Sequence, residues 1–202
     1  MTGGKEYRVN AIFYSLQGEG RHTGRAAAFV RFAGCNLRCA FCDTEFESFR
    51  EMSGEEILTA ILPYSTRFVV LTGGEPTLQV DETFVDLLHS HGYEVAMESN
   101  GTRPAPKNLD WLTVSPKSLP LPLQKEERVP DEIKIVFEED TAKKLTSFNL
   151  PPSTLLPLLY LQPCDTGDAQ RNAAILEQCI DYIKHHPQWR LSLQTHKLIG
   201  IE

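Results

Sequence analysis

The stretch Gly34-Cys35-Asn36-Leu37-Arg38-Cys39-Ala40-Phe41-Cys42-Asp43-Thr44 decides how the rest of the chain is interpreted. Three of the five cysteines lie here, at the spacing C-x3-C-x2-C. Three thiolates this close together can bind one metal centre, and soft thiolates favour zinc, copper(I) or iron–sulfur. A structural zinc site normally takes a fourth protein ligand, and the stretch holds no other cysteine or histidine. On a four-iron cluster, three ligands would leave one iron open for chemistry.

The cysteine loop resembles the cluster-binding loop of the radical S-adenosylmethionine (SAM) enzymes, because Phe41 places an aromatic residue before the last cysteine. In that family the residues matching Cys35, Cys39 and Cys42 hold a 4Fe–4S cluster, and its open iron binds the amino and carboxylate groups of SAM. Reduction by one electron then yields methionine and a 5'-deoxyadenosyl radical, which takes a hydrogen atom from the substrate. A zinc knuckle, or three buried structural cysteines, is the alternative interpretation of the loop.

Composition narrows the class of protein. The formal net charge is −7 at pH 7 and there is no block of basic residues, which argues against a nucleic-acid partner. No apolar run approaches the ~20 residues that span a membrane, and the polar start of the chain does not resemble a signal peptide. We therefore expect a cytoplasmic protein without a membrane partner. Five cysteines, clustered and without a secretory signal, indicate metal ligation rather than disulfides.

Hydrophobic patterning predicts an α/β fold. Strands are expected at 7–14, 26–32, 67–72, 93–98, 111–114, 132–137, 158–162 and 189–195, and helices from Ser53 onward and at 81–91, 141–148 and 168–186. Strands that alternate with helices indicate βαβ units and a parallel sheet. About six strands follow the cysteine loop, too few for a closed eight-stranded barrel. An open, truncated partial barrel is expected.

The domain organisation is expected to be simple. Residues 1–202 are predicted to form a single domain, in which 1–33 supply N-terminal strands with a substrate loop. The cluster loop would occupy 34–50, and the partial barrel with a C-terminal tail 51–202.

Polar motifs follow the predicted strands, at the sheet edge where ligands bind in such folds. Gly73-Gly74-Glu75-Pro76 offers bare backbone groups and a carboxylate, which suit an ammonium group. Ser115 and Lys117 can bond hydroxyls and a carboxylate, and Gln162 with Asp165 could hold a ribose or an adenine. The plain alternatives are a turn before a helix, a solvated lysine and a helix-initiating aspartate.

The N-terminal part supplies a second group of candidate binding residues. Gly18 and Gly20 permit close approach to a ligand, while Gln17 and Glu19 put an amide and a carboxylate at the same place; a hairpin turn is the alternative. Arg31, inside an apolar strand, needs a partner or an anion. His196, after the last predicted strand, is the histidine best placed for a substrate.

Together these motifs resemble the 7-carboxy-7-deazaguanine synthase family over essentially the whole chain. The most specific matches are LQGEG at 16–20, CDT at 42–44 and QTHK at 194–197. The resemblance implies conversion of 6-carboxytetrahydropterin to 7-carboxy-7-deazaguanine by radical ring contraction with loss of ammonia, in queuosine and deazapurine biosynthesis. It also implies a homodimer, a requirement for magnesium and a reductant such as flavodoxin.

The resemblance further assigns roles to individual positions. It places the pterin substrate against Leu16, Gln17, Gly18, Arg31, Thr72 and the C-terminal Glu202. It places SAM among Phe41, Cys42, Asp43, Gly74, Glu75, Ser115, Pro116, Lys117, Gln162, Pro163, Cys164 and Asp165. Thr44 would bind magnesium together with the substrate, because one neutral hydroxyl is a weak ligand alone.

Two other functions stay open. A glycyl-radical-enzyme activase shares C-x3-C-x2-C and GGEP, but LQGEG, CDT and QTHK are not expected there together. A non-catalytic iron–sulfur or zinc module would instead have a fully ligated metal and would bind no SAM.

Overall fold

The computed structural model describes residues 5–42, 45, 47–118, 128–146 and 157–202. Its strands are β1 (Glu6–Leu16), β2 (Ala26–Phe32), β3 (Arg50–Ser53), β4 (Phe68–Gly73), β5 (Glu94–Ser99), β6 (Trp111–Val114), β7 (Glu132–Phe137), β8 (Leu158–Pro163) and β9 (Trp189–Leu191). Its α-helices are α1 (Gly54–Ile61), α2 (Glu82–Ser90), α3 (Thr141–Leu145), α4 (Ala169–His185) and α5 (Thr195–Ile199), and short 3-10 turns η1 and η2 cover Gly20–His22 and Pro76–Leu78.

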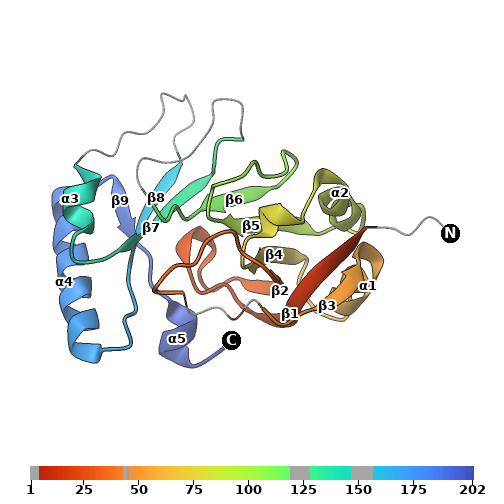
Figure 1. The fold of residues 1–202 in the computed structure, drawn as a ribbon, viewed down its shortest axis with the longest axis horizontal. Helices are drawn as coiled ribbons and strands as arrows, with labels where there is room; N and C mark the ends of the chain where they lie inside the picture. The colour runs from red at the N-terminus through yellow and green to blue at the C-terminus, as the bar shows by residue number, and fades with distance from the viewer. Residues whose placement is uncertain (1–4, 43–44, 46, 119–127, 147–156) are drawn as a thin grey trace.

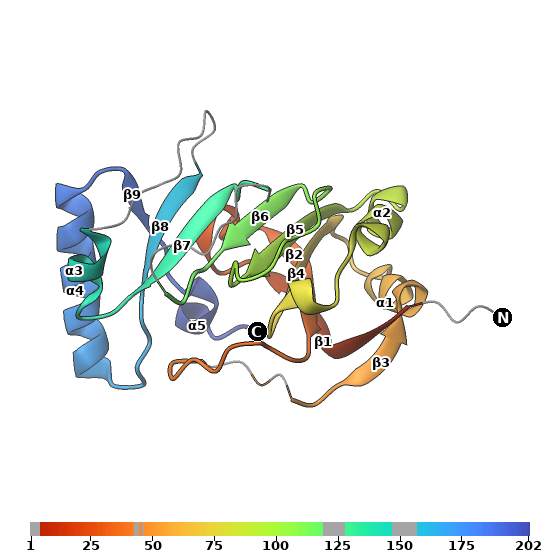
Figure 2. The same cartoon turned by 45° about the horizontal axis from the view of Figure 1, so that its top comes forward.

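The strands form one open sheet in the order β3-β1-β2-β4-β5-β6-β7-β8-β9. β1 pairs antiparallel with β2 and β3, whereas every pairing from β2 through β9 is parallel. In both views the sheet curves without closing, with α1 and α2 near β1–β5 and α3 and α4 near β7–β9 (Figures 1 and 2). The predicted α/β class and open, partial barrel are therefore confirmed.

Successive side chains along each parallel strand point to opposite faces of the sheet, and the two faces differ in character. On the helix-covered face, Leu71, Met97 and Leu161 lie in the two main cores and are fully buried. On the concave face, a small apolar cluster of Ala27, Phe29, Phe68, Val70 and Ala96 fills the floor. Toward the carboxyl ends of the strands, the side chains on this face are polar. There Arg31 on β2 is in register with Thr72 on β4. A parallel sheet buried on both faces thus carries a polar rim at one edge.

Helix capping follows the sequence closely. Ser53 and Glu56 form the predicted capping box at α1, and Asp81 caps α2. Asp168 caps α4 by accepting a hydrogen bond from the Arg171 N–H at 2.9 Å. These side chains satisfy backbone donors that have no partner within the helix.

Two elements were not predicted, and one is shorter than predicted. β3 is a four-residue edge strand in which only the Met52 side chain is buried. A strand this short shows no alternation of apolar and polar residues that would predict it. The last strand was expected to reach Thr195, but β9 ends at Leu191. Thr195 instead starts α5, because its N–H and hydroxyl both donate to the carbonyl of Gly18, at 3.0 and 2.9 Å. A long-range contact therefore turns the tail across the concave face.

Candidate active site

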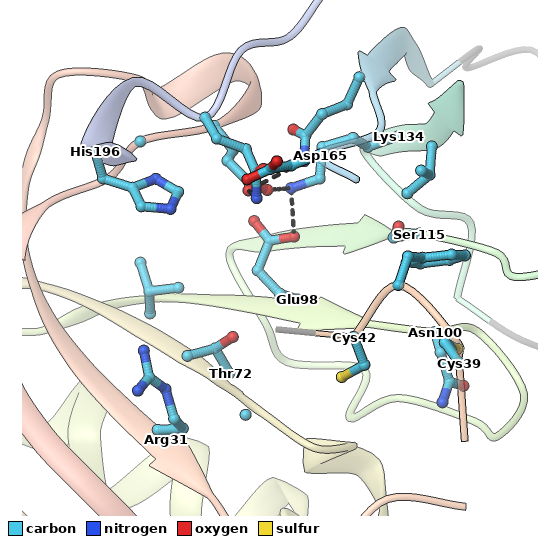
Figure 3. Close-up of a pocket in the computed structure, with 18 of the residues that line it drawn as sticks. Arg31, Cys39, Cys42, Thr72, Glu98, Asn100, Ser115, Lys134, Asp165 and His196 are labelled. Carbon is cyan, nitrogen blue, oxygen red and sulfur yellow. Dashed lines mark hydrogen bonds and ion pairs between the residues drawn. The ribbon is translucent and has the colours of Figure 1, made fainter. Parts of the chain in front are cut away.

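A cavity of about 400 Å³ opens at the carboxyl ends of the parallel strands. Of the residues predicted from the sequence, its walls contain Leu16, Gln17, Gly18, Glu19, Arg31, Cys35, Cys39, Phe41, Cys42, Thr72, Gly74, Ser115, Lys117, Gln162, Pro163, Cys164, Asp165, His196 and Glu202. In Figure 3, Cys39, Cys42, Asn100 and Ser115 gather on one side, and Arg31, Thr72 and His196 on the other. One cavity therefore brings the cysteine loop and the N-terminal candidate residues together.

The thiol end of the cavity has the donor set of a soft metal centre. Cys35, Cys39 and Cys42 are not joined in disulfides, and none of them is fully buried. Burial raises the pKa of the Cys39 thiol, while the ammonium group of Lys117 opposes that rise. Among the described side chains, no three potential ligands are already gathered at metal-binding distance. The three thiols nevertheless lie in one wall of the cavity, near the ammonium group of Lys117. This donor set fits an iron–sulfur cluster, which would bring the thiols closer together on binding.

The loop after β4 comes very close to the cysteine loop. A Cβ atom on Gly74 would lie 2.0 Å from the carbonyl oxygen of Gly34, so only glycine fits there. The N–H of Glu75 donates to the same carbonyl at 2.9 Å. Gly74 is therefore required for close backbone packing beside the first cysteine.

The Glu75 side chain has a different place from the one expected. Its carboxylate is fully buried and does not line the cavity. The two oxygens accept hydrogen bonds from Thr77, from the Ser99 hydroxyl (2.9 Å) and from the Asn100 N–H (2.7 Å). In this arrangement Glu75 joins the ends of β4 and β5, and its contact with SAM stays a prediction. Pro116 is also buried away from the cavity.

A buried ionic cluster lies between the two ends of the cavity. Lys134 on β7 donates to Glu19 at 2.5 Å and to Glu98 at 3.0 Å, and only 5% of its side chain is exposed. Figure 3 shows Glu98 and Lys134 pointing toward each other across the cavity. Gln162 and Gln194 also donate to Glu19, at 3.1 and 3.0 Å. The predicted ribose or adenine contact of Gln162 is untested, and its amide here holds the Glu19 carboxylate.

The two carboxylates of this cluster differ in protonation. Burial would raise the pKa of Glu19, but the ammonium group of Lys134 and hydrogen bonds outweigh it, and the pKa falls to about 2. Burial raises the pKa of Glu98 to about 7, which Lys134 opposes and the charge of Glu19 reinforces. The carboxylates around Lys134 outweigh its burial and raise its pKa. At neutral pH the Lys134–Glu19 pair is charged, and Glu98 is present in both its protonated and its ionised form.

We expect Glu98→Gln to change how stability depends on pH. Because the pKa of Glu98 is higher in the folded than in the unfolded chain, its contribution is fully present below about pH 4.5 and is lost as pH rises through about 7. A neutral glutamine removes this loss. The free energy of unfolding of the variant relative to the parent, measured by urea titration, should therefore rise between pH 5 and pH 8. A pH-independent difference would contradict the assignment.

The opposite end of the cavity carries the groups that can hold an anionic, ring-shaped ligand. The Arg31 guanidinium lies over the Phe13 ring, 5.0 Å from its centroid, and lines the cavity together with Thr72. A Cβ atom on Gly18 would come within 2.1 Å of His196 Nδ1, so the loop and the tail pack against each other. The Ser15 hydroxyl donates to the backbone carbonyl of Glu202 at 2.6 Å, which holds the chain end beside the cavity.

The structure adds site residues that the sequence did not single out, chiefly Glu98 and Lys134. Both lie inside strands, not in the motifs that follow them. A lysine in the apolar run of β7 was the available signal, because a buried lysine needs partners. Asp43 and Thr44, assigned to SAM and magnesium, lie outside the described residues.

A three-cysteine loop at the open edge of a parallel αβ sheet defines the class of protein. The model of the radical SAM superfamily matches residues 29–139. The chain is thus a radical SAM enzyme, and this class implies a 4Fe–4S cluster and SAM. The thiols and the close Gly74 backbone described above are the residues that fit them.

Relatives narrow the class to one family. The chain is 45% identical to the 7-carboxy-7-deazaguanine synthase of Bacteroides thetaiotaomicron over 96% of its length and 98% of that relative. It is 42% identical to the enzyme of the same name from Bradyrhizobium diazoefficiens, over 96% and 99%. The crystal structure of QueE from Escherichia coli superposes with a TM-score of 0.71 at 29% identity, covering 93% of each chain. The chain belongs to the 7-carboxy-7-deazaguanine synthase family, as its motifs predicted.

Within the described ranges, no helix combines the length and apolar character needed to cross a bilayer.

Proposed function

We propose that this chain converts 6-carboxytetrahydropterin to 7-carboxy-7-deazaguanine by SAM-dependent radical ring contraction with loss of ammonia. The observation that carries the proposal is the single cavity that joins the three cysteines to Arg31, Thr72 and His196. Family membership supports the same reaction, within queuosine and deazapurine biosynthesis. The single-domain organisation and the cytoplasmic location stay predictions.

The cysteine end of the cavity is proposed to bind the cofactors. Cys35, Cys39 and Cys42 would hold the cluster, and the bare backbone of Gly74 beside them would accept the ammonium group of SAM. Lys117 Nζ donates to the Ser115 hydroxyl at 2.8 Å and lies 5.7 Å from the Phe41 ring centroid, which places a cation for the SAM carboxylate. When bound, cluster and SAM supply a carbon radical that takes one hydrogen atom from the substrate.

The other end is proposed to bind and orient the pterin. Arg31 would pair with the substrate carboxylate, because its planar fork matches that group. Glu98 would accept hydrogen bonds from the amino-pyrimidine edge; with a pKa of about 7 it can also hold or release a proton there. Leu16, Gln17 and Gly18 would line the ring, and the tail carrying His196 and Glu202 would exclude water.

Gly74→Ala is expected to displace the cysteine loop and so to impair SAM cleavage. The added Cβ would meet the backbone of Gly34 at 2.0 Å and the Cys35 nitrogen at 3.1 Å, so the cysteine loop must move. A displacement of this size should lower SAM cleavage by about 100-fold, measured as 5'-deoxyadenosine by mass spectrometry. Gly24→Ala is the control, since a Cβ atom there would have no described heavy atom within 4 Å and only the positive φ is strained. Equal cleavage by the two variants would contradict this role.

Magnesium is proposed to bind at Thr44 only when substrate is present. One hydroxyl is a weak ligand, and Mg²⁺ usually completes its shell with waters and substrate oxygens. We expect calorimetry to show magnesium binding to the SAM-loaded enzyme only after substrate is added, and Thr44→Val to remove that heat. Binding of equal strength without substrate would contradict the proposal.

The partners proposed besides the substrate are a second copy of the chain and a reductant such as flavodoxin. Both rest on the family resemblance. Light scattering of the purified protein distinguishes dimer from monomer, and reduction of the cluster by flavodoxin can be followed by its absorbance.

Turnover is the direct test of the proposed function. The protein is reconstituted anaerobically with iron and sulfide, reduced, and given SAM, magnesium and 6-carboxytetrahydropterin. Formation of 7-carboxy-7-deazaguanine is the expected result. If only 5'-deoxyadenosine and methionine form, the substrate assignment is wrong; if SAM stays intact on a fully loaded cluster, the radical reaction itself is wrong.

A further inference from the structure

An exposed asparagine ties the cysteine loop to the end of β5. Asn36, directly after Cys35, accepts a hydrogen bond from Asn100 Nδ2 at 3.0 Å and donates its own Nδ2 to Thr102 Oγ1 at 2.7 Å. Asn100 Oδ1 accepts from the N–H and the hydroxyl of Thr102, at 2.9 and 2.6 Å. The three side chains thus form a closed set of hydrogen bonds, which we call the asparagine clasp.

The clasp is anchored in the buried part of the sheet. Asn100 is only 6% exposed, and its N–H donates to the buried Glu75 carboxylate at 2.7 Å. The N–H of Glu75 in turn donates to the carbonyl of Gly34 at 2.9 Å. The cysteine loop is therefore linked to the buried residue Glu75 on both sides of Cys35. The Gly34 carbonyl contacts the Glu75 backbone, and the Asn36 side chain is linked to the Glu75 carboxylate through Asn100.

Two other described hydrogen-bonding contacts of the loop stay within its own segment. Arg38 pairs with Glu47 further along the same segment, at 3.0 Å. Cys35 Sγ accepts a hydrogen bond from the N–H of Leu37 at 3.4 Å, which is local. The Asn36 side chain, in contrast, reaches out of the loop to Asn100 at the end of β5, beside Glu75.

We propose that Asn36 is a positioning residue that, through Asn100, fixes Cys35 against the Gly74–Glu75 loop. This inference rests on the proposed function, because it takes Cys35 as a cluster ligand and the Gly74 backbone as the site of the SAM ammonium group. The clasp would then hold the loop that carries this cluster ligand next to the backbone that would bind the amino group of SAM. Without the clasp, ordering the loop into the correct geometry costs free energy each time SAM binds.

The first test compares SAM binding by the loaded protein. Asn36→Ala removes both hydrogen bonds of an exposed side chain and leaves all three cysteines in place. We expect its dissociation constant for SAM, measured from the change in the electron paramagnetic resonance spectrum of the reduced cluster, to rise by about tenfold. Thr102→Val, which removes only the hydroxyl of the clasp, should give a smaller rise. Iron content per chain should stay that of the parent protein.

A matched control separates positioning from general destabilisation. Asn108 is another hydrogen-bonded asparagine, which donates to Glu82 O at 3.0 Å and Asp86 Oδ1 at 2.7 Å beside α2. Asn108→Ala removes comparable bonds at a residue that does not line the cavity. Its affinity for SAM should stay within about twofold of the parent value, since distant sites are usually independent.

The second test needs neither cluster nor SAM. In the full-length protein before iron is loaded, the rate of Cys35 alkylation is followed by peptide mass spectrometry. Asn36→Ala should increase this rate several-fold, with Cys39 and Cys42 serving as internal references. If the parent protein binds no SAM but Cys35 still loses its protection in Asn36→Ala, the proposed function fails while the positioning role holds. An unchanged Cys35 rate together with unchanged SAM affinity would overturn the inference.

Discussion

Lys134→Met is expected to destabilise the protein by about 3–5 kcal/mol at pH 8, the usual result of removing one partner from a buried charge pair. Lys134 Nζ contacts carboxylates on two other elements, Glu19 and Glu98, and is itself nearly inaccessible. Without the ammonium group, Glu19 must stay charged in a buried position or take up a proton. The loss of unfolding free energy should be measured by urea titration.

The pH dependence of this loss is part of the prediction. In the parent protein the depressed pKa of Glu19 contributes stability above about pH 4.5, and that stability is lost as pH falls toward 2. Without the ammonium group of Lys134, burial raises the pKa of Glu19 above its usual value. The variant then regains stability as Glu19 takes up a proton, so the difference between variant and parent should shrink as pH is lowered from 8 to 5. Adding Glu19→Gln to Lys134→Met should restore part of the stability at pH 8, because no unpaired charge is then left at position 19.

An exposed lysine provides the matched control. Lys144 pairs with Asp140 at 2.8 Å on the surface, one helical turn away, with 52% of its side chain exposed. Lys144→Met should therefore cost only about 0.3–0.5 kcal/mol. A loss at Lys134 no larger than the loss at Lys144 would show that the buried cluster does not stabilise the fold.

This cluster also shows which part of the site the sequence could not reveal. The cysteine loop and the motifs after β4, β6 and β8 were found because local spacing and strand ends are visible in the chain. Lys134 was visible as a charge inside an apolar strand, but its partners lie 115 and 36 residues away. Nothing local in the sequence identifies which carboxylates these are, because only the curvature of the sheet brings them together.

The glycines of the N-terminal loop illustrate the same limit. Gly18 and Gly20 were predicted to allow close approach to a ligand, and this stays a prediction; in the structure protein side chains approach both glycines closely. A Cβ atom on Gly20 would lie 2.0 Å from Glu132 Oε1, and one on Gly18 would meet His196. The need for a small residue was visible in the sequence, whereas the group that makes it necessary depends on tertiary packing.

Cys39→Ser is expected to abolish 5'-deoxyadenosine formation, because serine is a poor ligand for an iron–sulfur cluster that has only three protein thiolates. Iron and sulfide per chain after anaerobic reconstitution should fall to a small fraction of the parent value. Product formation and metal content are measured on the same preparation. Full iron content in this variant would mean that Cys39 is not a cluster ligand.

Cys164 provides the decisive comparison, because it is a cysteine in the wall of the same cavity. Its thiol is buried, its Sγ lies 3.9 Å from the carbonyl of Asp165, and burial together with nearby carboxylates raises its pKa. Cys164 lies outside the C-x3-C-x2-C loop that is proposed to hold the cluster, so Cys164→Ser should keep the full iron content. If that variant loses the cluster as Cys39→Ser does, Cys164 is a fourth ligand. No iron would then be open to SAM, and the chain would act as a fully ligated iron–sulfur module. Retention of iron in Cys164→Ser and its loss in Cys39→Ser together require the three-ligand cluster on which the proposed reaction depends.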